Sequence, residues 1–156
     1  MMRSDNWRQI VDGVGTIAVV VSLAYVGVQV KQNTAAIQTS TSQDVYELHQ
    51  QRTMAEMENP EFATLLLRVE RRPDEVSSVD SLRYRRYLNL NMNLQEAVYT
   101  NALNGTLERD MAAGWLEGMS TVLCRPWMRD YWRERKGGYH AAFQAAMDSV
   151  AAIATC

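Results

Sequence analysis

A stretch of 18 residues without a charged side chain, residues 13–30 (GVGTIAVVVSLAYVGVQV), constrains the fold of this chain more than any other feature. As an α-helix the stretch would be roughly 27 Å long, which is close to the thickness of the apolar layer of a membrane. Seven of its residues are valine, and such β-branched residues suit a helix best where lipid forces every backbone polar group to bond internally. We therefore predict a transmembrane helix over residues 13–30.

Two alternatives would place the same stretch elsewhere. A cleaved signal peptide has an apolar core of similar length, but no small-residue cleavage pattern follows closely here. A helix buried in a soluble core is the second alternative, and three glycines, Ser22 and Gln29 within the stretch are compatible with it. Trp7, just before the stretch, has the amphipathic ring that suits a membrane interface.

Positive charges near the stretch bear on its orientation. Arg3, Arg8 and the amino terminus precede it, whereas Lys31 is the cation that follows closely. Because cytoplasmic flanks are richer in Lys and Arg, this small excess favours an N-terminus inside the cell. The side of the membrane occupied by the rest of the chain stays open.

A line of small or uncharged polar residues runs along the predicted helix at alternating spacings of three and four, and we call this line the seam. The seam consists of Gly15, Ala18, Ser22, Tyr25, Gln29 and Gln32. Small residues let helices approach closely, and hydroxyl and amide groups can bond across such an interface. We expect association with further copies or with other membrane subunits along the seam. The alternative is that the polar residues 32–43 only link a membrane helix to a soluble domain.

Proline, glycine and capping residues divide the rest of the chain into helices. Residues 31–58 contain neither proline nor glycine, so one helix should continue to Asn59, which can cap the helix that Pro60 begins. Further helices are predicted over residues 60–72, from Ser77 or Ser78 to 104, over 107–123, over 126–136 and over 139–153. We expect Asn104 and Gly105 to end the segment that begins at Ser77 or Ser78, and Thr106 to cap the next helix.

No run of alternating apolar and polar residues has strand length, which predicts an all-α fold. The expected architecture is a long N-terminal transmembrane and stalk helix, residues 1–58, followed by a small bundle of about four to five helices, residues 59–156. The apolar residues expected in the bundle core are Phe62, Leu65, Leu66, Val69, Leu82, Leu88, Met92, Leu94, Val98, Met111, Trp115, Met119, Val122 and Leu123.

Residues that carry chemistry are few. His49 and His140 have no acidic residue or second histidine three or four positions later, and the sequence contains no phosphate-binding glycine motif, G-x-S-x-G or C-x-x-C. Cys124 and Cys156 lie far apart, which predicts no disulfide framework, and a reactive thiolate beside Arg125 is a weak candidate. We expect no enzyme, no metal and no cofactor.

Residues 125–136 form a second amphipathic pattern. Arginines recur four residues apart and aromatic residues occupy another face, which is typical of a helix lying at a membrane surface. The candidates for contact with that surface are Trp7, Arg125, Trp127, Arg129 and Arg133. Because Asp130 and Glu134 lie among the arginines, a solvated helix with ion pairs is the alternative. The formal net charge of -2 argues against nucleic acid as a partner.

Several segments together resemble a known group of proteins. They are Trp7, IAVVVSLAYVGVQVKQNT (residues 17–34), NPEF with the following LLLR (59–68), Leu107, Glu108, Trp115, and RPWMRDYWRERKGGYHAAF (125–143). As a set they resemble an uncharacterised bacterial family with one N-terminal transmembrane helix and a small all-helical domain. The resemblance covers nearly the whole chain and implies this architecture, with no established activity or ligand. Family members are more basic just after the membrane helix, which would favour a cytoplasmic C-terminal domain.

These features favour a noncatalytic single-pass protein of the bacterial inner membrane. It would act as a structural or assembly subunit, either as a homo-oligomer or as an accessory subunit of a larger membrane complex. Its partners would be membrane lipid and further copies or other subunits, and not nucleic acid. The alternative is a small oligomeric channel whose uncharged pore is lined by the seam. A third hypothesis is an enzyme or sensor with a pocket among Trp115, Trp127, Tyr131, Trp132 and Tyr139.

Overall fold

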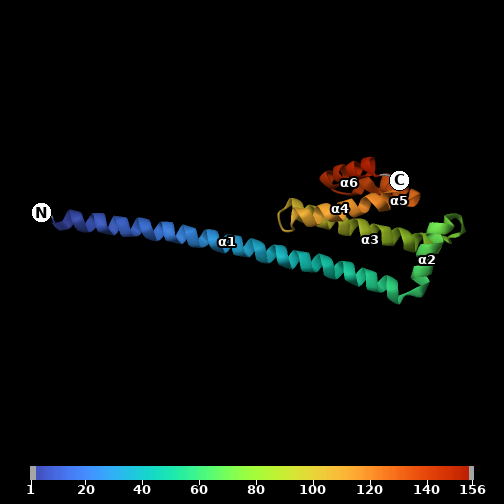
Figure 1. Cartoon of the computed structure of the whole chain (residues 1–156), viewed down its shortest axis with the longest axis horizontal. Coiled ribbons are helices and arrows are strands. Elements are labelled where there is room, and N and C mark those ends of the chain that lie inside the picture. Colours follow the sequence, from blue (N-terminus) through green and yellow to red (C-terminus); the bar gives the residue numbers. More distant parts are fainter. Residues whose placement is uncertain (1–2, 155–156) are drawn as a thin grey trace. The chain divides into compact units, whose positions relative to one another are not determined.

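The computed structural model describes residues 3–154, with side chains at residues 13–72 and 74–154. The described residues form six α-helices and no strand, which confirms the predicted all-α fold with a long N-terminal helix followed by a small helical bundle. The helices in Figure 1 are α1 (Arg3–Glu58), α2 (Pro60–Arg71), α3 (Ser78–Leu103), α4 (Arg109–Leu123), α5 (Pro126–Arg135) and α6 (Ala141–Ile153). Two short 3-10 helices, η1 (Pro73–Glu75) and η2 (Lys136–Gly138), lie in the connections.

The chain divides into two compact units, Met1–Ile37 and Gln38–Cys156. Helix α1 contributes to both of them. In the first unit every described side chain, from residue 13 to residue 37, is exposed. This part of α1 is long and apolar enough to cross a membrane, and none of its apolar window is buried inside the chain.

The core of the second unit lies where α3 packs along α4 and α4 packs along α6. Met92, Phe143 and Met147 are fully buried at its centre. The main cluster consists of Leu65, Val69, Tyr84, Leu88, Met92, Met119, Leu123, Met128, Tyr131, Trp132, Phe143 and Met147. Apolar burial of this kind is the main source of stability for a helical bundle of this size.

A smaller cluster extends the core to α1. Val45 is only 4% exposed and packs with Val98, Ala102, Leu107 and Ala112. Residues 38–58, which the sequence analysis expected as a stalk, therefore contribute to the core of the second unit. A stalk and a core helix can have the same residue spacing, and they are distinguished here by contacts with residues distant in sequence, such as those of Val45 in the smaller cluster.

Capping residues explain where α2 and α3 begin and where α3 ends. The Asn59 side chain accepts a hydrogen bond from the backbone N–H of Phe62 at 3.0 Å, and Pro60 opens α2, as predicted. Ser77 caps α3 in the same way, accepting from the N–H of Asp80 at 3.1 Å. Gly105 follows the end of α3 with a φ of 74°, a conformation that glycine adopts without strain.

Two expectations about the bundle were wrong. Thr106 does not cap α4, because its hydroxyl donates backwards to the Asn101 carbonyl oxygen at 3.1 Å, and α4 begins only at Arg109. Leu82, expected in the core, is 58% exposed. Leu88 and Met92 on the same helix are instead buried in the main cluster.

Candidate functional site

The first candidate site is the exposed surface of α1 in the first unit. Ile17 and Leu23 are each 66% exposed, and the other large apolar residues of this segment have similar values. They are Val14, Val19, Val20, Val21, Val26, Val28 and Val30. A soluble protein rarely leaves so continuous an apolar surface in water. Surfaces of this kind are usually covered by lipid or by another protein chain.

The seam residues lie on this surface, and all six are exposed. The Ser22 hydroxyl donates to the Ala18 carbonyl oxygen at 2.8 Å, and the Gln29 amide donates to the Tyr25 hydroxyl at 2.8 Å. Such bonds within one helix lower the cost of placing a polar side chain in an apolar environment. An amide has two N–H donors and a carbonyl oxygen, so Gln29 retains capacity to bond a neighbouring helix.

The second candidate site is a cavity of about 620 Å³ inside the second unit. Its walls come from residues 38–58 of α1 and from α2, α3, α4 and α5. The lining residues are Tyr46, His49, Arg52, Leu66, Glu70, Tyr84, Tyr87, Leu88, Asn91, Gln95, Gly114, Trp115, Gly118, Met119, Val122, Arg125, Trp127 and Met128. The volume lies within the range of about 300–1,000 Å³ that is usual for small-molecule sites.

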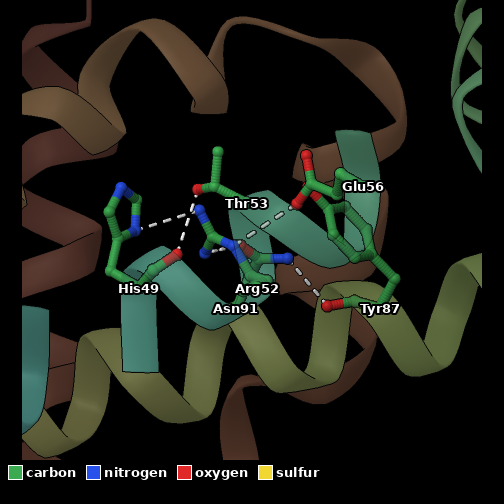
Figure 2. A network of polar contacts seen from close by, with 6 residues as sticks. All are labelled: His49, Arg52, Thr53, Glu56, Tyr87 and Asn91. Atoms are coloured by element: carbon green, nitrogen blue, oxygen red, sulfur yellow. Dashed lines mark hydrogen bonds and ion pairs between the residues drawn. The ribbon is translucent and has the colours of Figure 1, made fainter. Parts of the chain in front are cut away.

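A polar network on one wall of the cavity joins α1 to α3, and Figure 2 shows Arg52 at its centre. The Arg52 guanidinium donates to the Asn91 side-chain oxygen and lies 3.2 Å from Nδ1 of His49. It also pairs with the Glu56 carboxylate at 3.4 Å, and the Tyr87 hydroxyl donates to that same carboxylate at 2.8 Å. These contacts fix Arg52 in the wall of the cavity.

Tyr84 and Tyr87, which line the cavity, are kept in their protonated form. Burial, followed by the hydrogen bond to Glu56, raises the pKa of Tyr87. Burial, followed by the charge of the nearby Tyr87, raises the pKa of Tyr84 well above its ordinary value. Both hydroxyls therefore stay neutral at physiological pH, so neither is poised to act as a base.

The membrane-surface candidates on α5 all have partners within the second unit. Arg125 pairs with Glu70 and lies over the Trp127 ring at 5.7 Å. Arg129 donates to the Cys124 carbonyl oxygen at 3.0 Å, and Arg133 pairs with Asp130 at 3.1 Å. Arg125 and Trp127 also line the cavity, whereas Arg129 and Arg133 are exposed and are not among its lining residues. The side chain of Trp7 lies outside the described residues.

The aromatic residues proposed to form a pocket also separate into two groups. Trp115 and Trp127 line the cavity. Tyr131 and Trp132 are buried in the main cluster, and Tyr139 stacks on Trp132 with a centroid distance of 5.6 Å. Only part of the expected aromatic set therefore meets at one cavity.

Cys124 is disulfide-bonded, which corrects the expectation that the chain has no disulfide. A large separation in sequence does not by itself exclude a disulfide, because folding brings distant segments together. Cys124 is consequently no thiolate nucleophile. Within the part of the chain that the structure describes, no group of three or more His, Cys, Asp or Glu residues is placed to hold a metal ion.

Comparisons with protein-family models, with curated proteins and with solved structures found no match. Functional conclusions therefore rest on the two candidate sites themselves.

Proposed function

We propose that this chain is a noncatalytic single-pass membrane protein that acts as a structural or assembly subunit. One observation carries the proposal: the apolar side chains of residues 14–30 are exposed, and none of that window is buried within the chain. A core helix of a soluble protein would bury these side chains against its own domain. Membrane lipid is the solvent that best accommodates an uncharged helix of this length.

Association through the seam is the second part of the proposal. Gly15 offers open space, with nothing within 4 Å of an added Cβ atom, so another helix can approach closely there. Ser22 and Gln29 add polar groups that could bond across the contact. The partner is either a further copy of this chain or a different subunit of a larger membrane complex.

We propose the inner membrane of a bacterium as the location of the protein, because residues 17–34, 59–68 and 125–143 resemble an uncharacterised bacterial family with one transmembrane helix. The charge excess before residue 13 favours an N-terminus on the cytoplasmic side. The disulfide at Cys124 supports the same orientation, because disulfides persist in oxidising compartments outside the cytoplasm. Reporter fusions after residue 154 should then be active when they require export and inactive when they require the cytoplasm.

Membrane attachment is tested by alkaline extraction of membranes from cells that express the full chain. We expect the protein to stay in the membrane pellet, as an integral protein does. Recovery of the intact chain in the soluble fraction would contradict the proposal. A shortened product found outside the membrane would instead identify residues 13–30 as a signal peptide.

Association is tested by mild-detergent extraction followed by native mass spectrometry. A fixed number of identical chains would support a homo-oligomer, and different co-purifying subunits would support an accessory role. A homo-oligomer would make conductance in a reconstituted bilayer the next measurement, because its uncharged seam could line a pore. A monomer without partners would contradict the assembly proposal.

The seam itself is tested by the double substitution Ser22→Leu and Gln29→Leu. We expect the complex to dissociate more readily, because close approach and polar bonding across the seam are both removed. The matched control is Val20→Leu with Leu23→Ile, on the face away from the seam, which should leave the assembly intact. Equal stability of the two double variants in crosslinking would show that the seam is not the interface.

A further inference from the structure

We propose that the cavity of the second unit binds a small aromatic acid that carries an N–H or O–H hydrogen-bond donor. The cavity lies entirely within residues 38–156, so this inference does not depend on the function proposed for the membrane helix. Four properties of its walls lead to this ligand class: open space, two buried polar atoms without hydrogen-bond partners, aromatic surfaces and a pair of arginines.

The first property is the open wall on α4. Gly114 and Gly118 lie one turn apart on that wall, and an added Cβ atom at either position would meet nothing within 4 Å. Glycine weakens a helix interior compared with alanine, and no close packing within the chain requires it at these two positions. The two glycines instead leave room beside α4 for a molecule that the chain does not itself supply.

The second property is a pair of unsatisfied polar atoms. Within the part of the chain that the structure describes, Oε1 of Gln95 is buried and accepts no hydrogen bond. Nε of Arg52 is likewise buried and donates none, although it lies 3.4 Å from a Glu56 oxygen. Buried polar groups without partners are unfavourable and uncommon. A ligand with one donor and one anionic oxygen could satisfy both atoms.

The third property is the aromatic and sulfur-containing surface. Trp115 meets His49 edge to face at a centroid distance of 5.3 Å, and Trp127 meets Tyr84 in the same way at 5.3 Å. Met119 and Met128 also line the cavity, and thioethers make favourable contacts with aromatic rings. Ring edges and sulfur atoms favour a flat aromatic ligand over a branched aliphatic one.

The fourth property is the pair of arginines. Arg52 and Arg125 line the cavity, and each is paired with one carboxylate, Arg52 with Glu56 and Arg125 with Glu70. An acid is favoured because the buried Nε–H of Arg52 donates no hydrogen bond and can donate to an anionic oxygen, and because no unpaired carboxylate lines the cavity to attract a cation. The carboxylate of the ligand would then lie toward Arg52 and its ring donor toward Gln95.

The test uses the full chain in phospholipid nanodiscs with indole-3-acetate as the probe, because this molecule has an aromatic N–H donor and a carboxylate. Binding is followed by the methyl resonances of ¹³C-labelled methionines. We expect saturable shifts at Met119 and Met128, which line the cavity, and none at Met57, which is 73% exposed. The absence of saturable shifts at millimolar probe would overturn the proposal.

Two variants locate the binding. Gly118→Leu should fill the cavity and weaken binding by about tenfold or more, because the leucine takes the space of the ring. Gly137→Leu is the matched control, since Gly137 also has nothing within 4 Å and lies outside this cavity. Unchanged helix content by circular dichroism confirms folding in both. Equal affinity of the two variants would place the probe elsewhere.

A second probe tests the donor. The analogue 1-methylindole-3-acetate lacks the N–H and should bind the wild-type chain about tenfold more weakly, because Gln95 then remains unpaired. Gln95→Leu should abolish this preference between the two probes while still allowing binding. A preference that persists in Gln95→Leu, or no preference in the wild type, would refute the proposed role of the donor.

Discussion

Trp132 and Asp148 join α5 to α6, with the indole N–H donating to a carboxylate oxygen at 2.8 Å. The Lys136 ammonium donates to the other oxygen of the same carboxylate at 2.9 Å. The hydrogen bond from Lys136, and then that from Trp132, lowers the pKa of Asp148 below its ordinary value. The indole buried in the main cluster is thus held in place by an ion pair at the surface.

This relationship predicts a specific loss of stability in acid. Because the folded-state pKa of Asp148 is depressed, its contribution is present above its unfolded pKa of about 4 and is lost as the pH falls through the folded pKa. Urea unfolding followed by circular dichroism should show that Asp148→Asn lowers stability at pH 7 by less than about 1 kcal/mol, since the carboxylate is partly exposed. The variant should also lose less stability than the wild type on acidification.

Asp44→Asn is the control, because Asp44 is exposed on α1. It should leave both the stability at neutral pH and the acid response nearly unchanged. If Asp148→Asn and the wild type lose the same stability between neutral and acid pH, the contacts of Asp148 do not contribute as described.

Local signals in the sequence predicted the ends of the helices well. Asn59 followed by Pro60, and Ser77 before α3, have side chains that satisfy backbone N–H groups within the next three residues. Gly105 could be recognised because a positive φ favours glycine. In each case the interaction that decides the structure lies within a few residues of the amino acid that makes it.

One local signal was misleading, because Thr106 has the chemistry of a helix cap but donates its hydroxyl to the carbonyl and amide oxygens of Asn101, five residues earlier. Features that depend on distant contacts could not be predicted from local signals. The sequence around Val45 has the pattern of a stalk helix, and its burial depends on contacts with residues of α3 and α4 that are distant in sequence. Whether Leu82 is covered depends on which side of α3 meets other helices, and its spacing alone does not decide this.

The cavity was predictable only in part. Trp115 and Trp127 were candidate pocket residues, but the polar wall joins Arg52 to Asn91, which lie 39 residues apart. No local pattern connects those two positions. Gly114 and Gly118 were a visible signal, since two glycines four residues apart inside a predicted helix need a structural reason. The open space beside them supplies that reason.

The bond between Tyr87 and Glu56 predicts a loss of stability in alkali. The pKa of Tyr87 is raised in the folded state, so its contribution is present below the unfolded pKa of about 10 and is lost as the pH rises through the folded pKa. Tyr87→Phe should lower the free energy of unfolding at pH 7 by about 1 kcal/mol, because one hydrogen bond is removed. The free energy of unfolding of this variant should also fall less steeply than that of the wild type above about pH 10, which is the pKa of an unfolded tyrosine.

Urea unfolding at neutral and alkaline pH measures both effects. Tyr46→Phe serves as the control, because Tyr46 is 52% exposed. A Tyr87→Phe variant as stable as the wild type, with an unchanged alkaline response, would mean that the hydroxyl does not help to hold α1 on α3.

The cap at the start of α2 predicts a stability difference between two substitutions at one position. Asn59→Ala removes the oxygen that accepts from the N–H of Phe62, and should lower stability by about 1 kcal/mol. Asn59→Asp keeps an acceptor oxygen and adds a negative charge at the helix N-terminus, so it should retain wild-type stability. Thermal unfolding compares the three proteins, and equal destabilisation by Ala and Asp would exclude the cap as the cause.

Alanine substitutions at the two glycines of α4 should raise the free energy of unfolding, whereas an alanine substitution at Gly105 should lower it. Gly114→Ala and Gly118→Ala should each stabilise the chain by about 0.5–1 kcal/mol, because alanine is the better helix former and its Cβ atom meets nothing within 4 Å. Gly105→Ala should destabilise it by about 1–2 kcal/mol, because the backbone there has a φ of 74°. Urea unfolding of the full chain measures all three. Destabilisation by alanine at Gly114 or Gly118 would mean that a neighbour closes the space beside α4, and the cavity could then not admit a ligand on that wall.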